Sequence, residues 1–119
     1  MKKYETIKSH DEFNKLINNG KYIKNEYFVI YYDKSSRDST YPKFGIAIST
    51  KFGKSYIRNK YKRRVRSLIE QNKKLFKNNT DYIIMIRKTC INIKYKTMLE
   101  SFNNLVKEIK WIRKQKYFF

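Results

Sequence analysis

The chain has little of what most enzymes, secreted proteins and membrane proteins depend on. It contains one cysteine, Cys90, and one histidine, His10. A single cysteine excludes an internal disulfide, and these two lone residues supply no cluster of metal ligands. No apolar run approaches about 18 residues, the length that a membrane-spanning helix needs. Residues 1–7 lack the apolar core of a signal peptide, so we expect a cytoplasmic protein.

Acidic residues are also scarce, and they are unevenly distributed. The 119-residue chain has 29 lysine and arginine residues against 10 acidic ones, which gives a formal net charge of +19. From Ser39 to Ile69 there is no acid at all, so this stretch cannot neutralise its own charge, and we expect a polyanionic partner. With 17% aromatic residues the chain is too rich in rings for a disordered basic tail. Its length predicts a single domain over residues 1–119.

Glycine and proline are few, three and one, which predicts long elements joined by few loops. Ser9 and Glu12 have the spacing of a capping box, and they predict a helix over residues 10–19 with Gly20 as its left-handed stop. Runs of β-branched and aromatic residues predict three strands, at 27–32, 44–49 and 81–87.

The second of these strands alternates clearly between large and small side chains. Phe44, Ile46 and Ile48 would face one side of the sheet. Gly45, Ala47 and Ser49 would leave the other side shallow, with room for something to lie close.

Two longer segments have the periodicity of amphipathic helices. At about 100° per residue, the apolar residues of the segment 55–77 fall in one arc; they are Ile57, Tyr61, Val65, Leu68, Leu75 and Phe76. The segment from Tyr95 to Ile112 repeats the pattern, so the predicted fold is α/β with the order α-β-β-α-β-α. We expect the basic, aromatic tail after about residue 111 to be partly disordered.

Arginine is concentrated in one place in a chain that otherwise prefers lysine, 22 lysines against 7 arginines. Four of the seven fall within nine residues: Arg58, Arg63, Arg64 and Arg66. A guanidinium group binds phosphate bidentately and stacks on bases, which an ammonium group does less well. On a helix Arg58, Lys62 and Arg66 begin at the edge of the apolar arc and move away from it, so a basic side adjoins the packed side.

This basic side has an ordinary alternative explanation, a solvated face that keeps the protein soluble. Against it, residues 51–66 hold eight basic residues and no acidic partner, so something bound must offset their repulsion. The turn around Gly53 could also present backbone amides to a phosphate at the helix start. We therefore favour phosphate binding that weakens steeply with salt.

The residues of this helix carry a resemblance to a known family. Lys51 to Gly53, followed by Ile57 to Arg63 and by Arg66, closely resembles the signature of the protein component of bacterial ribonuclease P, an Arg-Asn-Arg core followed by Lys-Arg. Two features depart from the pattern. Lys60 stands where the family usually has arginine, which keeps the charge but loses the bidentate geometry. Ser55 and Tyr56 stand where small and branched apolar residues are common.

The resemblance covers most of the chain and implies both a fold and a role. It implies an α/β sandwich with a left-handed β-α-β crossover, in which the arginine-rich helix connects the strands at 44–49 and 81–87. It also implies that the protein binds the catalytic RNA subunit, one protein per RNA, together with precursor tRNA. The RNA, with Mg²⁺ held mainly by its phosphates, would hydrolyse the phosphodiester bond at the mature tRNA 5′ end. The protein would be inactive alone, with no catalytic residues and no metal ligands.

By similarity, the candidate site residues form two groups. The contacts with the catalytic RNA would be Lys51, Lys54, Arg58, Asn59, Lys60, Lys62, Arg63 and Arg66. The 5′ leader of the precursor would run through a cleft between sheet and helix that includes Phe13, Ile17 and Tyr31. Aromatic platforms beside a positive groove suit single-stranded RNA, although ordinary core packing explains Phe13 and Ile17 about as well.

Two other functions fit the composition. A small basic ribosomal protein would need the arginine-rich helix but not a cleft for a mobile single strand. A DNA-binding helix-turn-helix protein would need a second short helix before residue 55, and the sequence predicts none.

Overall fold

The computed structural model describes residues 5–7, 9–35 and 40–116, with side chains up to Ile109. The three α-helices are α1 (His10–Asn19), α2 (Ser55–Gln71) and α3 (Tyr95–Lys116). The strands are β1 (Lys21–Lys24), β2 (Phe28–Lys34), β3 (Lys43–Ile48) and β4 (Thr80–Ile86). Short 3₁₀ turns flank these elements: η2 (Thr50–Phe52) lies before α2, η3 (Lys73–Leu75) after it, and η4 (Lys88–Cys90) before α3.

The strands form one mixed sheet in the order β1-β2-β4-β3. β2 pairs antiparallel with both β1 and β4, whereas β3 and β4 are parallel. Parallel neighbours need a crossover, and α2 supplies it between β3 and β4. The predicted α/β sandwich and the connecting role of the basic helix are therefore confirmed. The left hand of the crossover stays a prediction of the resemblance.

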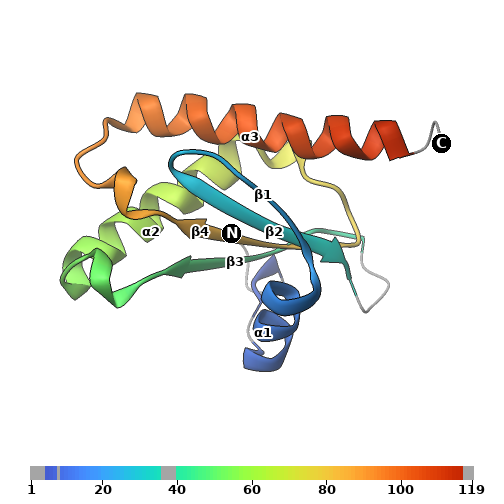
Figure 1. Cartoon of the computed structure of the whole chain (residues 1–119), viewed down its shortest axis with the longest axis horizontal. Helices are drawn as coiled ribbons and strands as arrows, with labels where there is room; N and C mark the ends of the chain where they lie inside the picture. Colours follow the sequence, from blue (N-terminus) through green and yellow to red (C-terminus); the bar gives the residue numbers. More distant parts are fainter. Residues whose placement is uncertain (1–4, 8, 36–39, 117–119) are drawn as a thin grey trace.

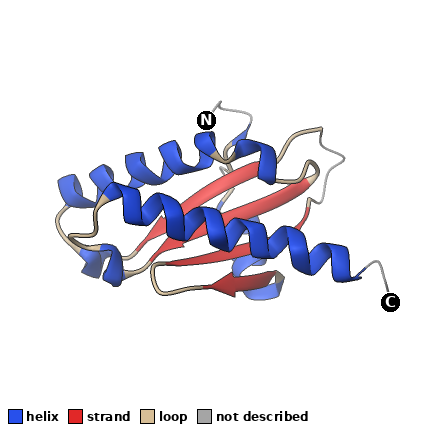
Figure 2. Ribbon diagram, turned by 90° about the horizontal axis from the view of Figure 1, so that it is seen from above, coloured by secondary structure: helices blue, strands red, loops and turns tan. Residues whose placement is uncertain are grey.

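The two faces of the sheet are covered unequally, because α3 runs along one side and α1 lies on the opposite side (Figure 1). Seen from above, α2 and α3 lie over the same face (Figure 2). Alternation along each strand assigns its residues to these faces. Phe44 packs on the face covered by α2 and α3. Gly45 faces α1, and a Cβ at this position would lie 3.1 Å from the ring of Phe13.

The α2 and α3 face holds most of the core, and aromatic rings dominate it. Phe44 lies edge-on to Phe76 and stacks on Tyr82, and Phe28 lies edge-on to Phe102. These five rings are nearly or fully buried. A large part of the aromatic richness of the sequence therefore stabilises the fold.

Several expectations from the sequence were wrong in detail. β1 was not predicted, so the order is α-β-β-β-α-β-α. Gly20 is not left-handed, since its φ is −75°; it is needed because a Cβ there would lie 2.5 Å from the carbonyl oxygen of Leu16. The helix predicted over 55–77 ends at Gln71, so Leu75 and Phe76 lie beyond it.

Two further expectations concern the C-terminal tail and the helix-turn-helix alternative. α3 is assigned to Lys116 and residues 117–119 lie outside the described part, so partial disorder after about residue 111 stays a prediction. The element directly before α2 is the 3₁₀ turn η2, and α1 lies across the other face of the sheet. A helix-turn-helix arrangement is therefore absent from residues 9–35 and 40–116.

Candidate RNA interface

The basic helix begins in a way that is unfavourable for the helix alone. Lys54 is the N-cap residue and makes no side-chain capping bond, and the first turn contains no acid. The helix dipole favours acids at this end and disfavours cations. Gly53 just before it has φ 156°, a backbone that favours glycine. The positive charge of Lys54 therefore reduces the stability of the free helix, as expected of a residue that is retained for binding.

The cations of the segment 51–66 have no acidic partners within the part of the chain that the structure describes. The ion pairs there join Lys73 to Glu5 at 2.7 Å and to Glu70 at 3.6 Å, after the end of α2. Arg58 instead donates to the carbonyl oxygen of Gly53 (3.2 Å) and to Oγ of Ser55 (3.3 Å). Arg58 thus fixes the turn before the helix as well as adding to its charge.

Helical geometry sorts the signature residues of α2 into three directions. Lys62 and Arg66, one turn apart, lie on the flank toward β3. Asn59 and Arg63 are exposed on the outward side, away from the core residues of the helix. Lys60 lies on the opposite flank, in line with Arg64. Lys51 and Lys54 are exposed beside the turn at the helix start.

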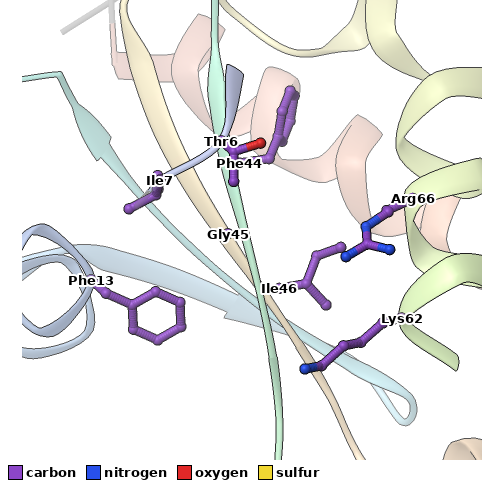
Figure 3. Close-up of a pocket in the computed structure, with 8 residues that line it drawn as sticks. All are labelled: Thr6, Ile7, Phe13, Phe44, Gly45, Ile46, Lys62 and Arg66. Carbon is purple, nitrogen blue, oxygen red and sulfur yellow. The ribbon is translucent and has the colours of Figure 1, made fainter. Parts of the chain in front are cut away.

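A cavity of about 500 Å³ lies between α2, β3 and α1. Lys62 and Arg66 point into it from α2, and Phe13 faces them from α1 across the strand that carries Gly45 (Figure 3). The remaining lining residues are Thr6, Ile7, Phe44 and Ile46. The predicted combination of an aromatic ring, a shallow strand surface and cations therefore occurs in one cleft, with Phe13 as its ring.

Ile17 and Tyr31 do not line this cleft. They line a second hollow of about 540 Å³ with β1 and the ends of β2 and β4. Both residues are half-buried and pack, like Phe13, against Ile7, Leu16 and Ile83. Core packing and exposure to a ligand are therefore combined in the same side chains.

The second hollow contains residues that were missed in the sequence because β1 was missed. The ring of Tyr22 is 58% exposed and lies 5.8 Å from that of Tyr31, and Lys24 and Arg87 add positive charge. The guanidinium of Arg87 donates to the carbonyl oxygen of Asn25 at 2.8 Å, and this hydrogen bond holds the guanidinium group in place. The four residues of β1, Lys-Tyr-Ile-Lys, do not alternate between polar and apolar side chains, so no period-2 pattern predicted this strand.

Acidic residues gather at another edge of α1, where Glu12, Asp33 and Asp81 line a small hollow of about 50 Å³. Burial raises the pKa of Asp81, nearby Lys43 opposes the rise, and Glu12 adds to it. Lys15 and Lys34 line the same hollow, so the charge at this edge of α1 is mixed.

The segment before α1 forms one wall of the cleft. The amide of Ile7 donates to the carbonyl oxygen of Phe44 at 2.9 Å, and Thr6 pairs in parallel with the same residue. The carboxylate of buried Glu5 accepts from Nζ of Lys73, an attraction that raises the pKa of the lysine. This ion pair fastens the wall to the end of α2.

The two residues that could have suggested protein-based chemistry lie apart. His10 is exposed on the first turn of α1, as predicted. Cys90 is buried, and its thiol donates to the carbonyl oxygen of Tyr27 at 3.3 Å. Among the described residues, no group of three His, Cys, Asp or Glu side chains is placed to hold a metal ion, and none of the helices is long and apolar enough to cross a membrane.

The chain is similar to proteins of a single family in sequence and in structure. The family described as Ribonuclease P matches residues 1–110. The ribonuclease P protein component of Mycoplasma mycoides is 40% identical over 92% of this chain and 100% of that protein. The one from Carboxydothermus hydrogenoformans is 31% identical over 92% of this chain and 95% of its own length.

Solved structures agree with this match. The RNase P protein of Thermotoga maritima superposes with a TM-score of 0.77 at 32% identity, over 87% of this chain and 96% of that one. A Staphylococcus aureus RNase P protein gives 0.82 at 25% identity, over 91% of this chain and 90% of that one. The chain therefore belongs to the ribonuclease P protein family, the protein subunits of an endoribonuclease that processes tRNA.

Proposed function

We propose that this subunit binds the catalytic RNA through the cations of α2 and holds the 5′ leader of precursor tRNA across the α1 face of the sheet. The single observation that carries the proposal is the cleft in which Lys62 and Arg66 face Phe13 over the bare strand at Gly45. A cationic wall, an aromatic ring and a strand with no side chain at Gly45 suit a single strand of RNA that lies close to the sheet. A ribosomal scaffold needs no such cleft, and the family match argues against that alternative.

The path of the leader follows from the strand register. Gly45 lies opposite Ile83 and Ile83 opposite Tyr31, so the floor of the cleft and that of the second hollow lie in one row across the sheet. Tyr22 continues this row onto β1. The leader would thus pass from Phe13 and Arg66 toward Tyr31 and Tyr22, with cations at both ends.

The chemistry belongs to the RNA in this proposal. The cleft contributes cations and a ring, which position phosphates but offer neither a general base nor a nucleophile. The side chains around the cleft would repel Mg²⁺, so RNA phosphates are the ligands that fit it. We infer an accessory protein, one per RNA, that acts in the cytoplasm and cleaves nothing alone.

Reconstitution with the catalytic RNA at low magnesium tests the proposal. Adding the protein should raise cleavage of precursor tRNA at the mature 5′ end and tighten precursor binding. Replacing Arg66 by alanine should lower the log-log salt slope of RNA binding by about 0.7–0.9, because one phosphate contact is lost. Lys107→Ala, at an exposed cation on α3, is the matched control and should leave the slope unchanged.

Two outcomes would contradict the proposal. Protein without RNA that cleaved precursor tRNA at a single site would place the chemistry in the protein. A protein that left both cleavage and precursor affinity unchanged would have no subunit role.

The structure also refines how the two binding surfaces should be separated. Arg66 shares the cleft with Phe13, so its loss should affect both the catalytic RNA and the leader. Arg63 is exposed on the outer side of α2, and Arg63→Glu should damage assembly alone. Phe13→Ala and Tyr31→Ala should weaken binding of precursors with a leader, but not of mature tRNA. Identical defects in Arg63→Glu and Tyr31→Ala would contradict a model with two surfaces.

A further inference from the structure

The flank of α2 that faces away from the cleft carries a second group of basic and polar side chains. Lys60, Arg64, Ser67 and Gln71 follow one another at helical spacing along this flank. The guanidinium carbon of Arg64 lies 5.1 Å from the centre of the Tyr61 ring, and the residue is half-buried, so its side chain does not simply extend into solvent.

The ring beneath Arg64 is fixed on several sides. Tyr61 is only 5% exposed, packs edge-on against Phe52 at 4.9 Å, and accepts a hydrogen bond from the amide of Asn92 at 3.0 Å. Asn92 itself has φ 65°, a left-handed backbone that turns the chain at this contact. A guanidinium held over a ring keeps its in-plane donors free, and less entropy is lost when it binds an anion.

The fold brings a second acid-free segment against this flank. From Tyr82 to Leu99 the chain has four basic residues and no acid, and the stretch 39–69 also lacks acids. The amide of Asn92 bonds to Tyr61, and the hydroxyl of Tyr95 lies 2.7 Å from Oγ of Ser67. Lys94 lies between these two contacts in the chain and is exposed. Two segments that cannot neutralise each other are therefore packed side by side.

The polar groups of the flank have a neutral network and no acid. Nε2 of Gln71 donates to the Tyr95 hydroxyl at 2.8 Å and to Oγ of Ser67 at 3.3 Å. Within residues 9–35 and 40–109, Arg64 has neither an ion pair nor a hydrogen bond, and its ring contact leaves its donors outward. Fixed cations beside neutral hydroxyl and amide groups suit a phosphate backbone with its 2′-hydroxyls.

We propose that this flank, defined by Lys60, Arg64 and Lys94, binds a second backbone segment of the catalytic RNA, distinct from the RNA at the cleft. The proposal rests on the proposed function, because the partner is the same RNA. α2 would then lie between two RNA segments, with Arg66 binding one segment and Arg64 the other. Such contacts would set the orientation of the protein on the RNA without reading its sequence.

The test uses the full chain and the catalytic RNA. Arg64→Ala with Lys94→Ala should lower the log-log salt slope of RNA binding by about 1.4–1.8, since two phosphate contacts are lost. Arg64→Lys should restore only part of the affinity, because an ammonium keeps the charge without stacking. The preference for precursors with a leader over mature tRNA should not change in assembled complexes. Lys107→Ala is the matched control for the removal of exposed charge.

Directed cleavage supplies a readout independent of affinity. An iron chelate attached at Lys94→Cys should cleave RNA positions different from those cleaved from Lys62→Cys, with Cys90 left in place because it is buried. If the double variant binds with the wild-type salt slope, or if no RNA is cleaved from position 94, this inference is wrong while the proposed function stands. If the wild-type protein fails to bind the catalytic RNA, the proposed function itself fails.

Discussion

The two faces of the sheet are made of the same strands, yet helices cover them to different extents. On one face α2 and α3 seal a core of interlocked aromatic rings that includes Phe28, Phe44 and Phe102. On the other, the ten-residue helix α1 covers only part of the surface: Gly45 is buried next to the Phe13 ring, whereas Ala47 and Tyr31 are only half-buried. The comparison shows how a small protein keeps a binding floor. Stability comes from the sealed face, so the other face can remain open for a ligand.

The largest expected effect comes from removing a ring on the sealed face. Phe102→Ala deletes a fully buried ring that contacts Phe28 and Phe76, so it should lower the free energy of unfolding by about 3–5 kcal/mol. Phe13→Ala on the open face should lower it by only about 1–2 kcal/mol, because that ring is half-buried. Urea denaturation of both variants measures the difference. Equal losses would show that the open face is as much a core as the sealed one.

A smaller effect is expected from filling the open face. A Cβ at Gly45 would lie 3.1 Å from the half-exposed Phe13 ring, which can move, and 3.4 Å from Cγ1 of fully buried Ile83; Gly45→Val adds two methyl groups beyond that Cβ. The change should therefore lower the free energy of unfolding by about 1–3 kcal/mol, while the affinity for the precursor leader falls by about tenfold. Fluorescence titration of assembled enzyme with precursor and mature tRNA measures the affinity.

The control for this prediction is Gly20→Ala at the end of α1. A Cβ at Gly20 would meet the backbone oxygen of Leu16 at 2.5 Å, which cannot yield like a side chain. That variant should lose stability without a selective loss of leader binding. If the Gly45→Val protein binds the leader normally, the strand surface at Gly45 is not part of the binding site.

The smallest effect concerns the thiol behind the sealed face. Burial raises the pKa of Cys90 to about 11. In the unfolded chain a thiol ionises above about pH 8.5, so between about pH 9 and 11 the unfolded state binds fewer protons than the folded one. Stability should therefore fall as the pH rises through this window. Relative to Cys90→Ala, the wild type should lose about 1–2 kcal/mol between pH 8 and pH 10.

The reactivity of the same thiol can be used to compare how often the two faces open. In the native protein Cys90 should react with a thiol reagent at pH 8 only as fast as the structure opens, because it has no exposed surface. A cysteine in place of half-buried Ala47 should react much faster. Similar rates at the two positions would mean that the faces open together.

Much of the fold could be predicted because it depends on local periodicity. The capping box at Ser9 predicted the start of α1, and the alternation at Phe44 assigned both faces of β3 before any contact was known. β1 was missed because it has only four residues and is flanked by polar ones. Gly20 was misread because its hydrogen atom is required by a close approach of backbone and not by a left-handed turn.

The candidate site was predictable in its residue types but not in its grouping. Lys62, Arg66 and Phe13 were all named from the sequence, and the structure joins them in one cleft. Ile17 and Tyr31 belong to the neighbouring hollow, whose exposed ring, Tyr22, had no signal without β1. The hollow of mixed charge at Asp81 is likewise formed by residues that are remote in sequence.

By itself the sequence determined that one helix carries an acid-free concentration of cations, which of its sides packs, and which family it resembles. These properties follow from residue spacing on a helix with a fixed angle per residue. Only the tertiary structure decided which ring faces those cations and that residues 92–95 pack against the flank of α2 that carries Arg64. The reason is physical. Which remote segments meet is set by the packing of both sheet faces, and no local period encodes that choice.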